Sequence, residues 1–256
     1  MAIEGYDRQA FGRKLAKLVF PAQPIHSIEH LFGRENELRR IEEALYASGR
    51  HIFIYGDRGV GKSSLAATAA NQYQSSDSEY IDVSCSPDAT FSDVIANIAY
   101  QAISASRLSK KTIKEKAGAN FKFLNLERAS EITLRDLHDE IKSLLDAVEM
   151  LREVSIVHSE TPVVVIDEFD RMESEKERAL FSDLLKHLGD KRIDIKFIFT
   201  GVASTIDALL GAHQSAIRQL ETIELPKLSW DARWEIVTDA AEEFGIEVDK
   251  NILVRI

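Results

Sequence analysis

The sequence has a single cysteine, Cys85, and only 12 glycines and 5 prolines among its 256 residues. One cysteine excludes disulfides within the chain and a cysteine-rich zinc site, so we expect Cys85 to pack at a strand end. No run approaches the roughly 18 consecutive apolar residues that a membrane-spanning helix needs. No apolar segment followed by a small-residue cleavage site is found near the N-terminus. These absences predict a cytoplasmic protein that has no membrane partner.

Basic residues are scarcer than acidic ones. The chain has 32 Lys and Arg against 42 Asp and Glu, which gives a formal net charge of −10 at pH 7. Neutralising nucleic-acid phosphates requires clustered Lys and Arg, so this balance argues against broad nonspecific nucleic-acid binding, although a local basic patch remains open. The hydrophobic content of 45% is enough for a full core in one large domain, or in one domain plus a fragment.

One octapeptide gives the clearest signal, and it follows the apolar run 51–55 directly. It matches the pattern G-x-x-x-x-G-K-[ST] and consists of Gly56, Asp57, Arg58, Gly59, Val60, Gly61, Lys62 and Ser63. Glycines let successive backbone N–H groups turn toward phosphate oxygens, because no Cβ atom is in the way. Lys62 can then reach the β- and γ-phosphates, and Ser63 offers a hydroxyl to Mg²⁺.

A helix is expected to follow this loop, from Ser64 to about Gln74. Its positive N-terminal end, with Ser64, would point at the same phosphates. A glycine-rich turn that matches by chance is the alternative, but it would not need a strand before it and a helix after it. We therefore predict a P-loop that holds a nucleoside triphosphate.

Strand-like and helix-like segments alternate along the chain, which predicts an α/β fold with a parallel sheet and helices on both faces. Apolar periodicity predicts helices at residues 36–47, 91–105 and 133–157. The polar, lysine-containing segment 106–132 is expected to be an insertion, either solvated or in contact with DNA or a partner. The expected strands are residues 51–55, 80–84, 162–167, 196–200 and 222–225.

A second motif runs from Val163 to Asp170, Val-Val-Val-Ile-Asp-Glu-Phe-Asp. Four consecutive β-branched apolar residues predict a strand buried on both faces, and its carboxylates then emerge at the carboxyl edge of the sheet, where the P-loop also lies. Asp167 is placed to hold Mg²⁺ beside Ser63. Glu168 is the candidate general base that would orient and deprotonate the attacking water. An acidic strand end or a helix cap is the alternative for this motif alone, and the P-loop upstream favours the nucleotide site.

The order of these motifs resembles that of AAA+ ATPases over about residues 25–245. The apolar strand that ends at Thr200, and Arg218 ahead of a further strand, belong to the same pattern. Residues 28–38 are similar to the box that precedes the P-loop in origin-recognition-type initiators, related bacterial AAA ATPases and STAND signalling ATPases. This resemblance implies ATP as the nucleotide. It also implies that Ile25, His26 and Phe32 contact adenine, with packing against the P-loop core as an equal alternative.

By the same resemblance, the fold is a three-layer P-loop NTPase of the ASCE class with a five-stranded parallel sheet. Thr200 matches the sensor-1 position near the γ-phosphate, where many relatives have Asn. Arg218 matches the arginine finger, which acts in trans on a neighbour's nucleotide and so implies a homo-oligomer. A surface arginine at a helix end is the alternative for Arg218. The histidines His26 and His30 fit H-x-x-E-H, but nearby prolines and Gly33 argue against a stable zinc-binding helix.

We expect three parts: an N-terminal extension at residues 1–24, an AAA+ core at 25–226, and the beginning of a helical lid at 227–256. The lid is expected to be truncated, with any DNA or protein partner engaged by regions beyond residue 256. The predicted function is a Mg-ATP-binding and hydrolysing module, initiator-like or transposition-regulator-like, that couples nucleotide state to oligomer assembly or partner engagement. A STAND-like signalling switch, for instance in bacterial defence, and a non-catalytic nucleotide-locked scaffold are the alternatives.

Overall fold

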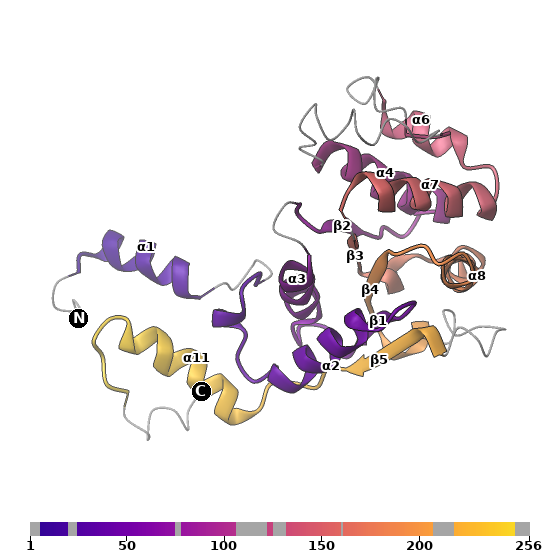
Figure 1. Cartoon of the computed structure of the whole chain (residues 1–256). Helices are drawn as coiled ribbons and strands as arrows, with labels where there is room; N and C mark the ends of the chain where they lie inside the picture. Colours follow the sequence, from indigo (N-terminus) through magenta and orange to yellow (C-terminus); the bar gives the residue numbers. More distant parts are fainter. Residues whose placement is uncertain are drawn as a thin grey trace.

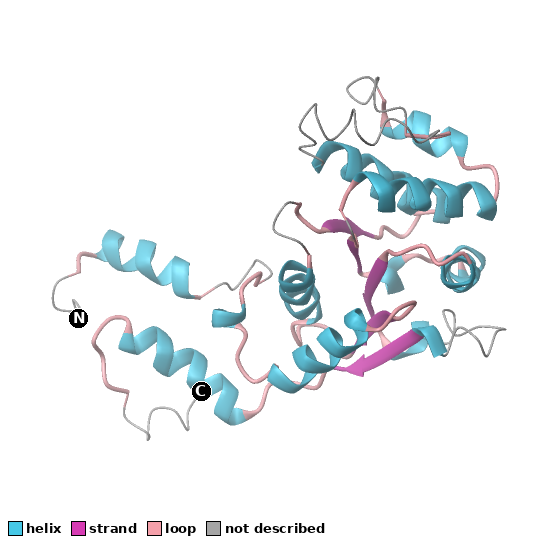
Figure 2. Cartoon of the chain, viewed as in Figure 1, coloured by secondary structure: helices cyan, strands magenta, loops and turns pink. Residues whose placement is uncertain are grey.

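The computed structural model describes residues 6–19, 25–74, 78–105, 122–124, 132–159, 161–206 and 218–248. Five strands form one sheet with the order β2-β3-β4-β1-β5, and every pair of neighbours is parallel. The α/β prediction with a five-stranded parallel sheet is confirmed (Figure 2). The strands are β1 (His51–Tyr55), β2 (Ile81–Ser84), β3 (Val163–Asp167), β4 (Lys196–Gly201) and β5 (Leu220–Glu224).

Side chains that alternate along the strands build two separate cores, one on each face of the sheet. Phe53 and Phe199 point into the first core, whereas Ile52 and Ile198 point into the second. The first core is covered by α4 (Phe91–Ala105), α7 (Leu144–Val157) and α8 (Glu175–Asp190), and the second by α2 (Glu35–Tyr46) and α3 (Lys62–Tyr73). Helix, sheet and helix thus form the three expected layers.

The expected single helix over residues 133–157 is wrong. Two helices occupy this stretch, α6 (Leu134–Glu140) and α7, and each has its own N-cap. The Thr133 hydroxyl accepts from the backbone of Asp136, and the Ser143 hydroxyl accepts from the backbone of Asp146. Ser143 is extended, with ψ of 164°, so the cap separates the helices while the apolar spacing continues across the break.

Part of the predicted insertion 106–132 lies within the described residues, and it is anchored in the first core rather than solvated. Phe123 and Leu124 are buried. The carboxylate of Glu153, on α7, accepts hydrogen bonds from the backbone N–H groups of Lys122, Phe123 and Leu124 at 2.6, 3.0 and 2.7 Å. The other residues of the insertion, apart from Ile132, lie outside the described part of the chain.

Helix α1 (Arg8–Leu18) lies beside α11 (Trp230–Glu242), away from the sheet (Figure 1). The rings of Phe11 and Phe244 are 4.7 Å apart between centroids, and Lys14 forms a 3.3 Å ion pair with Glu243. The N-terminal helix is thus held by the residues that follow α11. Within the described residues, every helix is too short or too polar to cross a membrane. The described residues also include the short 3-10 helices η1 (Ile28–His30), η3 (Phe169–Arg171) and η4 (Ala203–Thr205).

Candidate nucleotide-binding site

The predicted P-loop connects β1 to α3 at the carboxyl edge of the sheet. Helix α3 begins at Lys62, two residues earlier than expected, because Gly61 takes a left-handed conformation with φ of 96° and acts as its N-cap. Lys62 and Ser63 therefore lie in the first helical turn, where free backbone N–H groups and the helix dipole attract anions. The start of α3 is therefore a position suited to bind an anion.

Glycines give the loop its curvature, and two of them border open space. Gly56, Gly59 and Gly61 have φ of 157°, 81° and 96°. A Cβ atom at Gly56 would collide with the carbonyl oxygen of Leu225, whereas one at Gly59 or Gly61 would meet nothing within 4 Å. The Lys62 ammonium donates to the carbonyls of Gly56 and Asp57 at 3.0 and 2.9 Å, so it already lies across the loop. The Lys62 ammonium and the free backbone N–H groups at the start of α3 are donors of the kind that bind phosphate oxygens.

Asp167 is the point where three segments meet. The Ser63 hydroxyl donates to Asp167 Oδ1 at 3.0 Å, and the Thr200 hydroxyl donates to the same oxygen. The parallel register explains the meeting, since Asp167 ends β3, Thr200 lies in the neighbouring β4, and Ser63 follows β1. A carboxylate and hydroxyls are the hard oxygen ligands that Mg²⁺ prefers, so Ser63 and Asp167 fit the predicted metal.

Burial and the negative charge of Asp167 together raise the pKa values of two neighbours, Cys85 and Asp82. Burial, and next to it Asp167, raises the pKa of Cys85 to about 12, so this thiol stays protonated. The same two causes raise the pKa of Asp82 on β2. Cys85 is buried, as expected for a packing residue, and its backbone N–H donates to the carbonyl of Asp167 at 3.0 Å. The carboxyl edge thus concentrates negative charge that a cation would offset.

Glu168 adopts a conformation that is uncommon for a residue with a side chain, with φ of 52°. Its backbone N–H donates to Asp167 Oδ1 at 3.0 Å and to Thr200 Oγ1 at 3.1 Å, which fixes the turn. Its carboxylate accepts from Arg171 Nη1 at 2.7 Å, and this ion pair raises the pKa of Arg171. Arg171 was not among the residues predicted from the sequence. Its spacing three residues after the acidic pair would have been the only signal.

Two of the three residues expected at the adenine, Ile25 and His26, lie along α3. The backbone N–H of Ile25 donates to Ser64 Oγ at 3.1 Å, and its carbonyl accepts from Thr68 at 3.0 Å. The carbonyl of His26 accepts from Asn71 at 3.1 Å, so residues 25 and 26 follow the helix away from the P-loop. Phe32 is partly buried. His26 also precedes η1, so it does not share one helix with His30 as a zinc-binding pair would.

Arg34 is the second residue of this region that the sequence analysis missed. It is 4% exposed, and its Nη2 atom donates to the carbonyl of Val60 at 3.0 Å and to that of Pro226 at 2.6 Å. Burial lowers the pKa of Arg34, an effect opposed by Glu37. Its position beside Gly33, within the box at residues 28–38 that is similar to the one preceding the P-loop in other ATPases, was the available signal.

The comparisons with known proteins agree with this geometry. A family model described as AAA ATPase domain matches residues 30–198, about two thirds of the chain. The chain belongs to this AAA ATPase domain family. Its P-loop and the Asp167 strand end both fall inside the matched range, and the predicted kinship with AAA+ P-loop ATPases is confirmed. No curated protein matches the sequence.

Solved structures similar to this AAA ATPase domain share its fold at low identity. A Walker-type ATPase of Pyrococcus abyssi matches with a TM-score of 0.57 and 20% identity, covering 92% of this chain and 65% of the other. The Orc1 protein of Aeropyrum pernix, solved in complex with DNA, matches with a TM-score of 0.52 and 15% identity, covering 90% of this chain and 54% of the other. The replication initiator DnaA bound to AMPPCP and single-stranded DNA matches with a TM-score of 0.50 and 18% identity, covering 90% of this chain and 58% of the other. The chain thus spans between 54% and 65% of these proteins.

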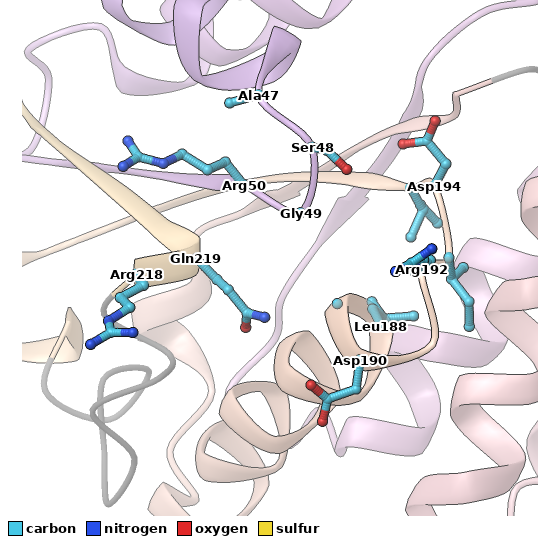
Figure 3. Close-up of a pocket in the computed structure, with 13 residues that line it drawn as sticks. Ala47, Ser48, Gly49, Arg50, Leu188, Asp190, Arg192, Asp194, Arg218 and Gln219 are labelled. Atoms are coloured by element: carbon cyan, nitrogen blue, oxygen red, sulfur yellow. The ribbon is translucent and has the colours of Figure 1, made fainter.

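Arg218 of this AAA ATPase domain lies far from the P-loop. It precedes β5, whose Leu220 pairs with His51 at the start of β1, whereas the P-loop follows the end of β1. Arg218 is exposed at a cavity of about 590 Å³, where Figure 3 shows it next to Gln219, with Asp190 and Arg192 at the end of α8. The parallel sheet therefore separates Arg218 from the chain's own P-loop.

Proposed function

We propose that this chain is a Mg-ATP-binding and hydrolysing module whose nucleotide state controls assembly with further copies and engagement of a partner or DNA. Membership of the AAA ATPase domain family supports nucleotide binding. In this proposal the glycines and Lys62 hold the phosphates, and Ser63 and Asp167 hold Mg²⁺. Ile25, His26 and Phe32 line the adenine site. Bound Mg²⁺ would offset the negative charge that develops on the phosphates during hydrolysis.

The observation that carries the proposal is the meeting of Ser63, Thr200 and Glu168 around Asp167. The hydroxyls of Ser63 and Thr200, from two other segments, and the backbone N–H of the adjacent Glu168 converge on this one carboxylate beside the P-loop. In the proposed reaction, Glu168 takes a proton from the attacking water, and Thr200 senses the γ-phosphate. Lys62 stabilises the charge on the phosphoryl oxygens.

Phosphate release by the wild type, the Glu168→Gln variant and a matched Glu173→Gln variant tests this proposal. Glu173 is exposed and lies outside the converging group. A general base contributes about 10²- to 10⁴-fold to the rate, so Glu168→Gln should lose at least about a hundredfold in turnover while ATP affinity is kept. Absence of turnover in the wild type under every condition would reject hydrolysis and leave a nucleotide-locked scaffold.

Assembly is the second half of the proposal. Arg218 is exposed on the edge opposite the P-loop, which supports a head-to-tail arrangement that brings it to a neighbour's γ-phosphate. We further propose residues 25–226 as the AAA+ core and α11 as the start of the lid. Measurement of molar mass by light scattering, with and without Mg-ATP, tests the assembly. A mass that stays monomeric at all nucleotide concentrations would contradict it.

A signalling switch is the second candidate, and one observation favours it. The Glu168 carboxylate is paired with Arg171, so the proposed base is engaged in the structure, which favours slow turnover until the pair opens. An initiator-like or transposition-regulator-like protein should be stimulated by duplex DNA, whereas a switch should not respond to it. Turnover and binding are therefore measured with and without duplex DNA. Stimulation by DNA supports the first candidate and rejects the second.

A further inference from the structure

Arg34 connects two segments that are far apart in the sequence. One nitrogen atom, Nη2, donates to the carbonyl of Val60 in the P-loop, 26 residues away, and to the carbonyl of Pro226, 192 residues away. Nη1 lies 3.7 Å from the carboxylate of Glu37, which holds the guanidinium from its other side. Because the guanidinium is planar and its donors have fixed directions, the two carbonyls cannot move independently without losing a bond.

Close contacts around Arg34 hold the P-loop against the segment that leads to α11. The backbone N–H of Leu225 donates to the carbonyl of Tyr55 at 2.7 Å, directly before the loop. A Cβ atom at Gly56 would collide with the Leu225 carbonyl, and one at Gly33 would collide with Ala232 on α11. Buried Arg34 therefore connects the P-loop to residues 225–232 by hydrogen bonds where the two segments are closely packed.

We propose that Arg34 is a positioning residue that transmits the state of the P-loop to Pro226 and hence to α11. The proposal rests on the proposed function in one respect, which is that the P-loop takes nucleotide phosphates. Backbone N–H groups that turn toward a phosphate rotate their peptide planes, so the carbonyl of Val60 shifts and Arg34 shifts with it. Water cannot replace the lost bonds, since the guanidinium is buried.

Helix α1 is coupled to α11 and therefore takes part in the same movement. Phe11 and Lys14 pack against Phe244 and Glu243 at the end of α11, so the N-terminal helix moves with α11. The moving unit is thus the α1–α11 pair, which lies clear of the sheet in Figure 1. A phosphate bound at one edge of the sheet changes the orientation of a helical pair formed by the two ends of the described chain.

The chain contains its own reporter for this movement. Its two tryptophans, Trp230 and Trp234, both lie on α11, so tryptophan emission reports on this helix alone. Trp230 is 56% exposed and its ring stacks with Arg233, which makes its emission sensitive to rearrangement. Calorimetry with AMPPCP and Mg²⁺ measures nucleotide binding separately, so occupancy and movement are read by independent signals.

The variants are Arg34→Met, Arg34→Lys and the matched control Arg39→Met, which removes an exposed arginine from α2, the helix that begins directly after Arg34. Emission of the wild type and of Arg39→Met should change as AMPPCP saturates the site. At saturation, Arg34→Met should retain under about a quarter of that change, with affinity weakened about tenfold. Arg34→Lys should fall between them, because an ammonium lacks the planar fork. A full emission change in Arg34→Met, or none in the wild type at saturation, would overturn the proposal.

Hydrogen–deuterium exchange of the nucleotide-free proteins separates this proposal from the proposed function. Loss of the link should raise amide exchange at residues 56–62 and 225–232 together in Arg34→Met, and in neither segment in Arg39→Met. Exchange that is unchanged, or raised in only one segment, would contradict the link. A wild type that binds no nucleotide would reject the proposed function, while this measurement would still judge Arg34. If Arg34→Met does not fold by circular dichroism, Arg34→Lys is used for both measurements, with smaller changes in the same direction.

Discussion

The Ser63 hydroxyl and the Asp167 carboxylate, 104 positions apart in the sequence, are joined by a 3.0 Å hydrogen bond. The bond forms because α3 starts and β3 ends at the same edge of the sheet. Ser63 is the donor, so Asp167 presents an oxygen that also accepts from Thr200. The two residues proposed to bind the metal are thus held together before any ligand arrives, which favours binding by reducing its ordering cost.

The first prediction concerns this pair. Ser63→Ala and Asp167→Asn should each remove most of the gain in ATP affinity that Mg²⁺ provides, because each deletes a metal ligand or its orienting charge. We expect a loss of about tenfold to a hundredfold in the presence of Mg²⁺, from charge-assisted bonds worth about 1.5–3 kcal/mol. Nucleotide titrations with Mg²⁺ and with EDTA measure the difference.

The double variant supplies the control. Residues that act on one ion are not additive, so Ser63→Ala combined with Asp167→Asn should lose little more than the worse single variant. Affinity in EDTA should change by less than about threefold in all three proteins. Equal losses with and without Mg²⁺ would show that the residues support the fold of the loop and not a metal.

The second prediction concerns the buried Glu153. Its carboxylate accepts three backbone N–H groups from residues 122–124 and is fully buried. Glu153→Gln replaces one acceptor oxygen by an NH₂ group that faces donors, so the free energy of unfolding should fall by about 3 kcal/mol. Urea denaturation measures this change. The control is Glu149→Gln on the same helix, whose partly exposed ion pair with Arg152 should contribute about 0.5 kcal/mol.

Sequence patterns predicted the elements whose chemistry is local. The P-loop needs glycines at set positions, and the buried strand before Asp167 needs a continuous β-branched run, so both are visible in short windows. The break between α6 and α7 was missed because the caps at Thr133 and Ser143 interrupt the helix without interrupting the apolar spacing. Periodicity detects a buried face, and the buried apolar residues of both helices belong to the same core, so the pattern runs on across the break.

Long-range polar contacts could not be read in this way. Glu153 on α7 and Arg34 before α2 look like ordinary charged residues, and only the fold places them against backbone groups 26 or more residues away. The ion pair between Glu168 and Arg171 is easier to predict from the sequence, since the residues are only three positions apart. It depends on the left-handed turn at Glu168, which residue types alone do not predict.

The third prediction is a pH dependence of stability that arises from His51. This histidine is buried at the start of β1, and burial, with Lys196 as a smaller cause, lowers its pKa to about 3. The unfolded chain binds a proton at His51 below about pH 6.5, whereas the folded chain does so only below about 3. Stability from this group is thus lost as the pH falls from about 6.5 toward 3, by up to about 1.4 kcal/mol per pH unit.

His51→Gln isolates this contribution from the carboxylates that titrate over the same range. The glutamine oxygen is an acceptor that can replace His51 Nδ1, which accepts from the Phe197 N–H at 3.2 Å. The difference in unfolding free energy between wild type and variant should therefore shift with pH between 4 and 6.5 and level off above about 7.5. Parallel curves at every pH would contradict the assignment to His51.

The fourth prediction addresses Arg218. Arg218→Ala should lose about 10³-fold or more in ATP turnover with little change in ATP affinity, because an arginine finger acts on the transition state. Arg192→Asn is the control: Arg192 lines the same cavity and has φ of 53°, which Asn tolerates well. Its turnover should stay within about threefold of the wild type. Phosphate release and calorimetric ATP binding measure both quantities.

Mixing two inactive variants decides whether Arg218 acts in trans. Lys62→Ala should bind ATP about tenfold to a hundredfold more weakly, since the bonds of the ammonium to phosphate are lost, but it keeps Arg218. Arg218→Ala keeps an intact P-loop. In a head-to-tail assembly, Lys62→Ala places its Arg218 at the nucleotide of an Arg218→Ala neighbour, so the mixture should regain turnover that neither variant has alone. A mixture no more active than its components would show that Arg218 is a surface residue of this edge.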